Sequence, residues 1–315
     1  MREFWRVGVE YLRISLTDRC NLRCLYCYSH GNKLSQEELL SFGEIERLVR
    51  IGVSLGIRRV RLTGGEPLVR KGVEKLLAKL SLLPELEDIS LTTNGILLAK
   101  FAEKLQEAGL KRVNVSLDTL NPAKFQWLTG RRKLKEVLGG IKEACEQGLN
   151  PVKVNVVVLR HVNQDEVIDF VKFSVENRLS VRFIEFMPSL GSLPWERFFF
   201  PLSLVKREVA KYFSMREIEV EGGGPAEYYQ VEGEGVIGFI APITCSFCSR
   251  CNRIRITPEG RVKPCLGSVY SLDLKEALRA KEGDEVIRER MKYAVLCKSS
   301  PHPFEKKVSF ARVGG

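Results

Sequence analysis

Short runs of β-forming residues alternate with segments of helical periodicity over residues 11–187. Strands joined by helical crossovers pair in parallel, so the alternation predicts an α/β fold with one parallel sheet. The pattern fits both an incomplete TIM-like barrel and a doubly wound sheet. The expected strands are residues 11–17, 58–63, 88–93, 112–118, 152–159 and 181–187. The expected helices are residues 42–55, 71–81, 97–108, 133–148 and 164–178.

The first expected helix has the apolar stripe of a helix that covers a sheet. The stripe consists of Ile45, Leu48, Val49, Gly52 and Val53. The pattern changes after Pro188, where one helix and three short strands are expected at residues 201–213, 216–220, 227–232 and 236–240. We therefore expect two modules, residues 1–235 and residues 236–315.

The unusual residues of the chain lie where the expected strands end. Three cysteines follow the first strand, TGGEP (63–67) follows the second, and TTNG (92–95) ends the third. Ser116 and Asp118 end the fourth strand, and Met187 with Pro188 ends the sixth. The βα loops of a parallel α/β fold meet at the carboxyl edge of the sheet, so we expect one site built by most of the strands.

Cys20, Cys24 and Cys27 form a Cys-x3-Cys-x2-Cys triplet. A structural zinc site requires four ligands, and His30 is the only further candidate nearby, so zinc fits poorly. A [4Fe–4S] cluster bound by three thiolates would keep one iron free to hold a substrate. With Tyr26 before the last cysteine, the triplet resembles the signature of the radical S-adenosylmethionine (SAM) superfamily, whose open iron chelates the amino and carboxylate groups of SAM.

Gly64 and Gly65 of TGGEP are by themselves consistent with a tight strand-to-helix turn. In the radical SAM superfamily, this turn brings bare backbone against the amino group of SAM, an approach that a side chain would block. Beside the cysteine triplet, the resemblance therefore implies that Gly65 contacts SAM.

A second set of thiols lies at residues 245–266, where Cys248, Cys251 and Cys265 are accompanied by Cys245 as a fourth candidate. Cys-x2-Cys spacing also occurs in zinc ribbons. If residues 252–257 are extended, Arg253 and Arg255 project from one face beside these thiols. Two guanidiniums suit an anion clamp better than a zinc-ribbon core. We expect Cys248, Cys251 and Cys265 to bind a second metal cluster.

Several stretches together resemble the molybdenum cofactor biosynthesis protein A (MoaA) family of GTP 3′,8-cyclases over nearly the whole chain. These stretches are LRISLTDRCNLRCLYC, RFIEFMP, FCSRCNRIRIT with the later CL, and the terminal Gly-Gly. The resemblance implies an incomplete (β/α)6 TIM-like barrel with a C-terminal cluster-binding extension, and one [4Fe–4S] cluster in each module. The sequence departs from the family at Tyr28 to His30, where a Met-Pro type continuation is usual, and at the additional thiol of Cys245.

The resemblance also implies roles for individual residues. Cys20, Cys24 and Cys27 would hold the SAM cluster, and the positions that would line SAM are Tyr26, Gly65, Ser116 and Met187. The positions that would bind the nucleotide are Arg13, Arg61, Thr92, Lys153, Arg182, Arg253 and Arg255. Arginine forks and a lysine suit a triphosphate. Gly314 and Gly315 would form a tail that reaches the substrate and supports the radical step.

The implied activity is that of a lyase that converts GTP to (8S)-3′,8-cyclo-7,8-dihydroguanosine 5′-triphosphate in the first step of molybdenum cofactor biosynthesis. An electron from the first cluster would cleave SAM to methionine and a 5′-deoxyadenosyl radical, which takes the hydrogen from C3′ of GTP before C3′ attacks C8. The second cluster would anchor guanine. Implied partners are an electron donor such as flavodoxin or ferredoxin and a separate pyranopterin-forming enzyme, and a homodimer is compatible with the family.

Two other classes of protein fit parts of the pattern. One is a radical SAM enzyme with an auxiliary cluster that acts on a peptide or RNA, and the other is a non-enzymatic zinc-binding protein. The net charge of +11 suits an anionic partner. No appended nucleic-acid module or aromatic-rich basic patch is evident, so no nucleic acid is expected. The sequence has no signal peptide and no apolar run long enough to span a bilayer, so we expect a cytoplasmic protein with no membrane contact. In that reducing compartment, the nine cysteines are expected to bind metal rather than form disulfides.

Overall fold

The computed structural model describes residues 8–27, 33–220, 224–268, 270–280 and 282–298. The contacts of Tyr28 to His30 and the implied roles of Gly314 and Gly315 lie outside the described residues.

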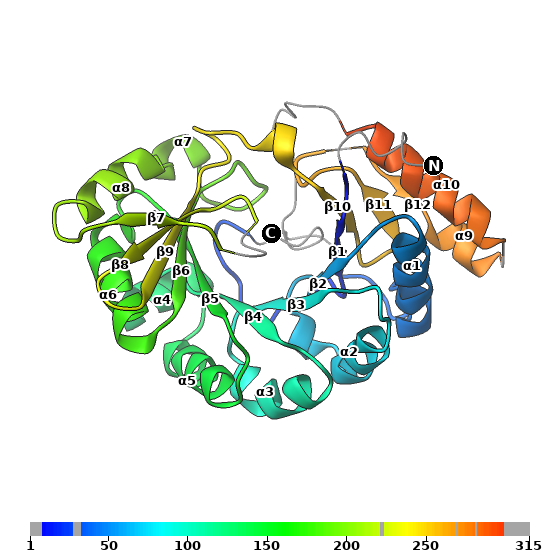
Figure 1. Cartoon of the computed structure of the whole chain (residues 1–315), viewed down its shortest axis with the longest axis horizontal. Helices are drawn as coiled ribbons and strands as arrows, with labels where there is room; N and C mark the ends of the chain where they lie inside the picture. The colour runs from blue at the N-terminus through cyan, green and yellow to red at the C-terminus, as the bar shows by residue number, and fades with distance from the viewer. Residues whose placement is uncertain (1–7, 28–32, 221–223, 269, 281, 299–315) are drawn as a thin grey trace.

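Six parallel strands form the centre of one sheet (Figure 1). They are β1 (Tyr11–Ser15), β2 (Arg59–Thr63), β3 (Asp88–Thr93), β4 (Arg112–Ser116), β5 (Val152–Val158) and β6 (Ser180–Glu185). Strands that follow one another in the chain are also neighbours in the sheet, whereas in a doubly wound sheet the order reverses. The fold is therefore an incomplete (β/α)6 barrel, with its helices on the convex side of the curved sheet (Figure 1).

The crossover helices bury an apolar face against the sheet. α1 (Phe42–Ser54) begins with a capping box, in which the Glu44 N–H donates to the Ser41 hydroxyl and the Ser41 N–H donates to the Glu44 carboxylate. Its expected stripe is buried, except that Val53 is only partly so. The other crossover helices are α2 (Val73–Ser81), α3 (Leu98–Glu107), α5 (Leu134–Glu146) and α6 (Val167–Asn177). α4 (Pro122–Thr129), capped by Asn121, was not expected from the sequence.

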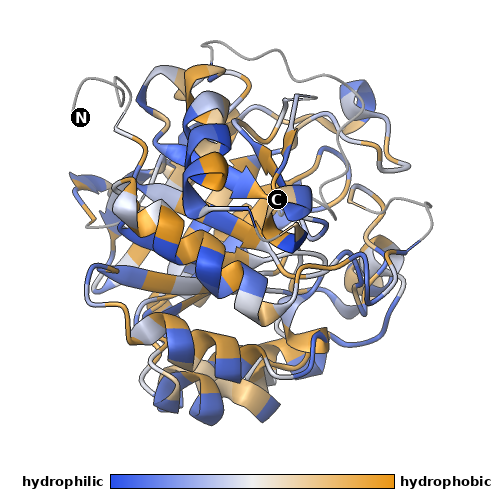
Figure 2. Cartoon of the chain, turned by 90° about the vertical axis from the view of Figure 1, so that its right-hand side faces the viewer, coloured by the Kyte–Doolittle hydropathy of each residue, from blue (hydrophilic) through white to orange (hydrophobic). Residues whose placement is uncertain are grey.

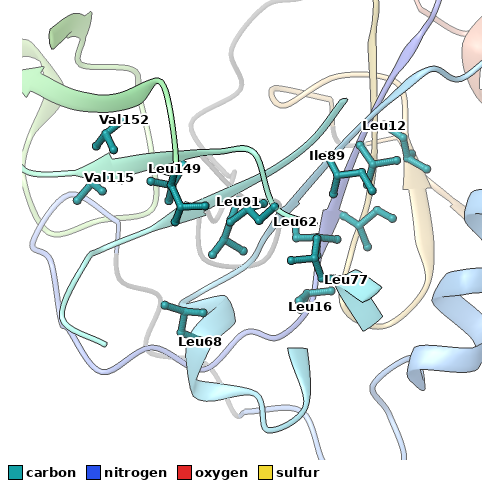
Figure 3. Packing of buried hydrophobic residues seen from close by; sticks show 14 of the residues in the cluster. Leu12, Leu16, Leu62, Leu68, Leu77, Ile89, Leu91, Val115, Leu149 and Val152 are labelled. Atoms are coloured by element: carbon teal, nitrogen blue, oxygen red, sulfur yellow. The ribbon is translucent and has the colours of Figure 1, made fainter. Parts of the chain in front are cut away.

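Successive side chains of each strand face opposite sides of the sheet. Leu12, Leu62 and Leu91 belong to the hydrophobic core between the sheet and the helices (Figure 3). The alternate positions of the same strands carry polar side chains such as Arg13 and Arg61. The concave side of the sheet is therefore lined by polar groups and is not filled by packed apolar layers.

Strands from the second half of the chain extend the sheet at both edges. β9 (Gly235–Ile240) pairs in parallel with β6 and is followed outward by β8 (Glu227–Val231) and β7 (Arg216–Ile218). β10 (Arg253–Ile256) pairs in parallel with β1 and is followed by β11 (Arg261–Lys263) and β12 (Leu272–Asp273). The expected short strands are present. The division into residues 1–235 and 236–315 stays a prediction.

α10 (Asp284–Leu296) covers the same side of the barrel as α1 (Figure 1). Its buried Met291 lies against Gly52, and the Arg47 guanidinium donates to Asp284 at 2.8 Å. Figure 2 shows hydrophobic and hydrophilic residues interleaved along the outer helices, as amphipathic helices require. The remaining helices are α7 (Trp195–Phe198), α8 (Leu202–Val209) and α9 (Lys275–Arg279). In the described part of the chain, no helix has the length and apolar character needed to cross a membrane.

Candidate active site

Cys20, Cys24 and Cys27, which we call the first thiol set, lie in the loop that follows β1. The Cys27 N–H donates to the Cys24 carbonyl at 3.0 Å and closes a turn. Burial raises the pKa of the Cys24 thiol well above its ordinary value, and the neighbouring Cys27 and Asp118 raise it further. Burial and the nearby Cys20 raise the pKa of Cys27 to about 12. Thiolates here require a compensating cation, so the loop fits an iron–sulfur cluster.

The two glycines of TGGEP bring the loop after β2 against the backbone that leads into the first thiol set. The Gly65 N–H donates to the Thr17 carbonyl at 2.7 Å, and the Glu66 N–H donates to the Arg19 carbonyl at 2.8 Å. A Cβ on Gly64 would lie 2.6 Å from the Thr17 oxygen, and one on Gly65 would lie 2.3 Å from the Arg19 oxygen. This close approach between two loops already requires glycine. Contact between Gly65 and SAM stays a prediction.

Glu66 connects three loops around the first thiol set. Its fully buried carboxylate accepts hydrogen bonds from the Thr93 hydroxyl and the Asn94 N–H, both at 2.7 Å, and burial raises its pKa to about 7. The Asn94 side chain in turn donates to Asn21 at 2.7 Å and contacts the Cys20 sulfur at 3.6 Å. Glu66 and Asn94 stood in the quoted motifs, but sequence reasoning gave them no role.

Tyr26 holds the other side of the loop. Its hydroxyl donates to the Asp118 carboxylate at 2.6 Å, and its ring meets Phe186 edge to face. The Ser189 hydroxyl donates to the Tyr26 carbonyl at 2.5 Å. The carboxyl end of β4 and the segment after β6 therefore fix Tyr26 in place. Its contact with SAM, and that of Ser116, stay predictions.

Gly65→Ala is expected to displace the loop, because the added Cβ would meet backbone atoms of Arg19 that cannot rotate away. We expect a loss of about 1–3 kcal/mol in the free energy of unfolding and a loss of iron from the first site. Thermal unfolding and iron analysis measure the two effects. Gly139→Ala is the matched control, because Gly139 lies in α5 with nothing within 4 Å of the added Cβ. That control should gain about 0.5–1 kcal/mol, and full iron content in Gly65→Ala would contradict the prediction.

A cavity with about 1110 Å³ of empty space, open to solvent at its mouth, lies between the strands and the C-terminal extension. Parallel strands in register place Arg13 beside Arg61 on one side and Arg255 on the other. The predicted site residues that line the cavity are Arg13, Arg61, Thr92, Arg182, Met187, Cys248, Cys251, Arg253, Arg255 and Cys265. The predicted residues that do not line it are Cys20, Cys24, Cys27, Tyr26, Gly65, Ser116 and Lys153.

The guanidiniums of this cavity repel one another. Burial, together with Arg255, Arg253 and Arg61, holds the pKa of Arg13 well below its ordinary value. Burial and the neighbouring cations lower the pKa of both Arg61 and Arg255 to about 10. The buried Nε atoms of Arg13, Arg182 and Arg253 have no hydrogen-bond partner within the described residues. Such a site is built to receive an anion of several charges.

Lys153 lies in β5 behind the cavity wall. It is 1% exposed, and its ammonium is 5.4 Å from the centre of the Tyr228 ring. Burial, together with Arg182, Arg112 and Arg61, lowers its pKa to about 7. The lysine therefore does not form the cavity surface, and burial and the positive field of the arginines disfavour its charged form.

Tyr11 also lines the cavity and was missed by sequence reasoning. The Arg61 and Arg13 guanidinium carbons lie 5.3 and 5.9 Å from the centre of its ring, and its hydroxyl is 3.4 Å from the Ser90 hydroxyl. Burial alone would raise its pKa, but Arg61, Arg13, the hydrogen bond with Ser90 and Arg112 together outweigh burial and lower the pKa from 10.0 to about 8.

This shift predicts a pH dependence of stability. In the pH range between the two values, the folded protein carries the phenolate while the unfolded chain keeps the phenol. The stability contributed by Tyr11 is therefore complete above about pH 10 and is lost as pH falls through about 8. The free energy of unfolding of the wild type, minus that of Tyr11→Phe, should rise by about 2–3 kcal/mol between these values. Denaturant unfolding at several pH values measures the difference, and a constant difference would disprove it.

The second thiol set lines the same cavity as the arginines. Cys251 contacts the Lys298 ammonium at 3.3 Å; burial would raise its pKa, but Lys298 and Arg253 lower it. Cys245 is exposed and does not line the cavity. These positions favour Cys248, Cys251 and Cys265 as the ligands, which stays a prediction.

The donor sets distinguish a cluster from a single ion. Among the residues that the structure describes, no three Cys, His, Asp or Glu side chains are placed so that they could hold a metal ion. A structural zinc ion requires four ligands about 2.0–2.3 Å from one point. The cysteines of an iron–sulfur cluster bind different irons and need not converge on one point. Two sets of three thiols therefore fit clusters better than zinc.

Asn155 and Phe247 are further cavity residues that sequence reasoning missed. Asn155 pairs in register with Arg182, and its buried side-chain oxygen has no partner among the described residues. The signal for Tyr11 and Asn155 was present, because both stand at alternate strand positions that share a face with predicted site residues. Phe247, 5.6 Å from the Arg253 guanidinium carbon, lies in an irregular segment without such periodicity.

Two family descriptions match most of the chain. Residues 14–174 match the Radical SAM superfamily, and residues 179–304 match Molybdenum Cofactor Synthesis C. A GTP 3′,8-cyclase of Petrotoga mobilis is 42% identical over 318 residues, which cover 98% of both chains. A GTP 3′,8-cyclase of Syntrophomonas wolfei is 44% identical over 319 residues, again covering 98% of both chains.

The crystal structure of Streptococcus suis SuiB bound to precursor peptide SuiA has a TM-score of 0.68 at 16% identity and covers 98% of this chain and 71% of that one. SuiB bound to S-adenosylmethionine has a TM-score of 0.64 at 16% identity and covers 93% of this chain and 75% of that one. At this identity the likeness supports the fold alone. The sequence relatives go further: the chain belongs to the radical SAM superfamily and, within it, to the GTP 3′,8-cyclase family.

Proposed function

We propose that this chain is a radical SAM GTP 3′,8-cyclase, a lyase that converts GTP to (8S)-3′,8-cyclo-7,8-dihydroguanosine 5′-triphosphate in the first step of molybdenum cofactor biosynthesis. One observation carries the proposal. A single cavity is lined both by arginines from β1, β2, β6 and β10 and by the second thiol set. A nucleoside triphosphate would neutralise the arginines with its phosphates and present its base to the metal site.

The arginines would bind and orient the triphosphate. Arg13, Arg61 and Arg255 are adjacent in register, so their forks can share the oxygens of one phosphate chain. Thr92 of β3 and Arg182 of β6 would also contact the substrate, with Lys153 buried behind them. Because these groups repel one another without an anion, binding would also relieve strain in the empty site.

When bound, SAM and two [4Fe–4S] clusters would supply the electron transfer and the radical chemistry. Cys20, Cys24 and Cys27 would hold one cluster, and Cys248, Cys251 and Cys265 the other. Met187 packs with Cys27 and Leu266, so the two thiol sets adjoin across one small apolar contact. This adjacency would let the protein hold C3′ and C8 of the nucleotide in register beside SAM and exclude water from the reacting atoms.

The proposal extends to partners and to the C-terminus. An electron donor such as flavodoxin or ferredoxin would reduce the first cluster, and a separate enzyme would convert the product to the pyranopterin. The cavity described above would serve the cyclisation alone, and the later conversion would take place on the separate enzyme. Gly314 and Gly315 would support the radical step.

Anaerobic, reconstituted protein tests the proposal directly. With SAM and dithionite, formation of 5′-deoxyadenosine and of the cyclised nucleotide should depend on GTP and should not be supported by ATP or by a peptide. Iron and sulfide analysis of the same preparation should give about eight irons per chain, the content of two [4Fe–4S] clusters. SAM cleavage that is independent of GTP, or zinc in place of iron at the second thiol set, would contradict it.

A further inference from the structure

Lys298, just after α10, reaches the second thiol set from a distant part of the chain. Its ammonium donates to the Arg253 carbonyl at 2.6 Å and contacts the Cys251 sulfur at 3.3 Å. Both partners belong to the short segment that leads from the second thiol set into β10. The Lys298 N–H donates to the Val295 carbonyl at 2.9 Å, so the backbone of the lysine is also held by the end of the helix.

The position of the helix is fixed independently of Lys298. Ile287, Met291 and Ala294 of α10 are fully buried, and Arg47 of α1 pairs with Asp284 at the first turn. The lysine therefore extends from a packed helix toward the sulfur, and its ammonium position does not depend on a flexible surface segment. Neither of these two acceptors of the Lys298 ammonium is a carboxylate. Its positive charge is thus directed at the thiol set.

A charged N–H donor beside a cysteine ligand has a defined effect on a metal cluster. Hydrogen bonds to the sulfurs and nearby charge are among the factors that set the reduction potential of iron–sulfur clusters. A positive charge at this distance favours the more negative, reduced cluster and stabilises the cysteinate against loss from iron. The second hydrogen bond, to the Arg253 carbonyl, holds the same ammonium to the strand that carries Arg253 and Arg255 into the cavity.

We propose that Lys298 is a positioning residue for the second cluster: its ammonium holds the Cys251 sulfur and the start of β10 in one geometry and raises the reduction potential of the cluster. The inference rests on the proposed function, because it takes Cys251 as a cluster ligand. It adds a residue from just after α10 to the surroundings of the cluster.

Substitutions at Lys298 separate the charge from the tether. Lys298→Met removes both the charge and the donors at similar length, whereas Lys298→Gln keeps a donor for the Arg253 carbonyl and removes the charge. Lys298→Arg keeps both. Lys292→Met is the matched control, because Lys292 lies in α10, just before Lys298 in the chain, and pairs with Glu289 at 2.6 Å. It loses the same charge without losing a contact to sulfur.

The second cluster is observed alone in the full chain with Cys20, Cys24 and Cys27 replaced by alanine. In this background, spectroscopic redox titration should give a more negative midpoint potential for Lys298→Met and Lys298→Gln than for Lys292→Met. Iron release to a chelator should be roughly tenfold faster for Lys298→Met, as expected when a partner of a metal ligand is lost. Lys298→Arg should restore most of both values. In metal-free full-length protein, hydrogen exchange at the end of α10 should be faster for Lys298→Met.

Equal potentials and equal release rates for Lys298→Met, Lys298→Gln and Lys292→Met would overturn the inference. If Lys298→Met does not fold, the comparison of Lys298→Gln with Lys292→Met decides the matter. Failure of the proposed function would look different, because the background protein with an intact Lys298 would then bind no second cluster at all.

Discussion

Cys24→Ala is expected to abolish SAM cleavage, whereas Cys265→Ala should lose about half of the iron and keep some SAM cleavage that no longer yields the cyclised nucleotide. Cys24 lies near Cys27 in the loop after β1. Hydrogen bonds of Gly65, Asn94 and Tyr26 hold this loop in place. Cys265 lines the cavity beside the arginines. Each substitution should therefore empty one site and spare the other.

Iron and sulfide analysis, with chromatography of deoxyadenosine and of the nucleotide product, measures both outcomes. Cys145→Ala is the matched control, because Cys145 lies exposed in α5, outside both thiol sets, and loses the same sulfur. It should keep all the iron and full turnover. Equal and total loss of SAM cleavage in Cys24→Ala and Cys265→Ala would contradict the division of labour between the two sites.

Arg13→Met is expected to weaken GTP binding while making the nucleotide-free protein more stable. Arg13 is held among Arg61, Arg253 and Arg255, and its buried Nε has no partner in the described structure. Methionine fills a similar volume without the charge, so the mutual repulsion falls. The lost charge-assisted contact to phosphate, about 1.5–3 kcal/mol, corresponds to a roughly 10–150-fold weaker binding of GTP.

Thermal unfolding without nucleotide, together with binding measurements, tests both signs. Arg112→Met is the informative control, because Arg112, on β4, is also a barrel arginine but forms a two-pronged pair with Asp88 at 2.5 and 2.6 Å. Removing that guanidinium leaves a partly buried carboxylate unpaired and should destabilise the protein by about 1–3 kcal/mol. If Arg13→Met destabilised the protein as Arg112→Met does, the cavity would not be the strained cationic site inferred here.

The strands, the helices and their parallel pairing could be predicted from the sequence because they obey local periodicity, whereas the barrel itself was implied only by the family resemblance. The resemblance assigned Arg13, Arg61, Arg182 and Arg255 to one nucleotide site, and the alternation of side chains explains how four different strands bring them to one cavity. The parallel register then places these side chains next to one another, because paired residues of neighbouring strands point to the same face of the sheet. Lys153 stands at an alternate position of β5 that faces the same side of the sheet, but its side chain is buried and does not line the cavity.

Contacts between distant loops could not be predicted in this way. The hydrogen bond from Tyr26 to Asp118 joins positions 92 residues apart, and no periodic pattern encodes it. The sequence suggested that glycine is needed at positions 64 and 65 because SAM approaches the backbone there. The structure shows that the backbone of Thr17 and Arg19 already lies too close for a side chain at these positions. α4 was missed because its eight residues present little periodic signal; its recognisable signs are the Asn121 cap, the following proline and Gly130 at its end.

The pairing of β10 with β1 sets an order on how the two halves of the site can form. β1 is among the first segments to be synthesised, and its partner, Arg253–Ile256, is among the last. During synthesis one edge of β1 therefore stays open until the chain is nearly complete. Apart from the contact of Cys27 with Leu266, the surroundings of Cys20 to Cys27 draw on residues up to Phe198, whereas the arginine cavity requires β10. A nascent or truncated chain should thus form most of the loop that carries Cys20, Cys24 and Cys27 before it has completed the arginine cavity.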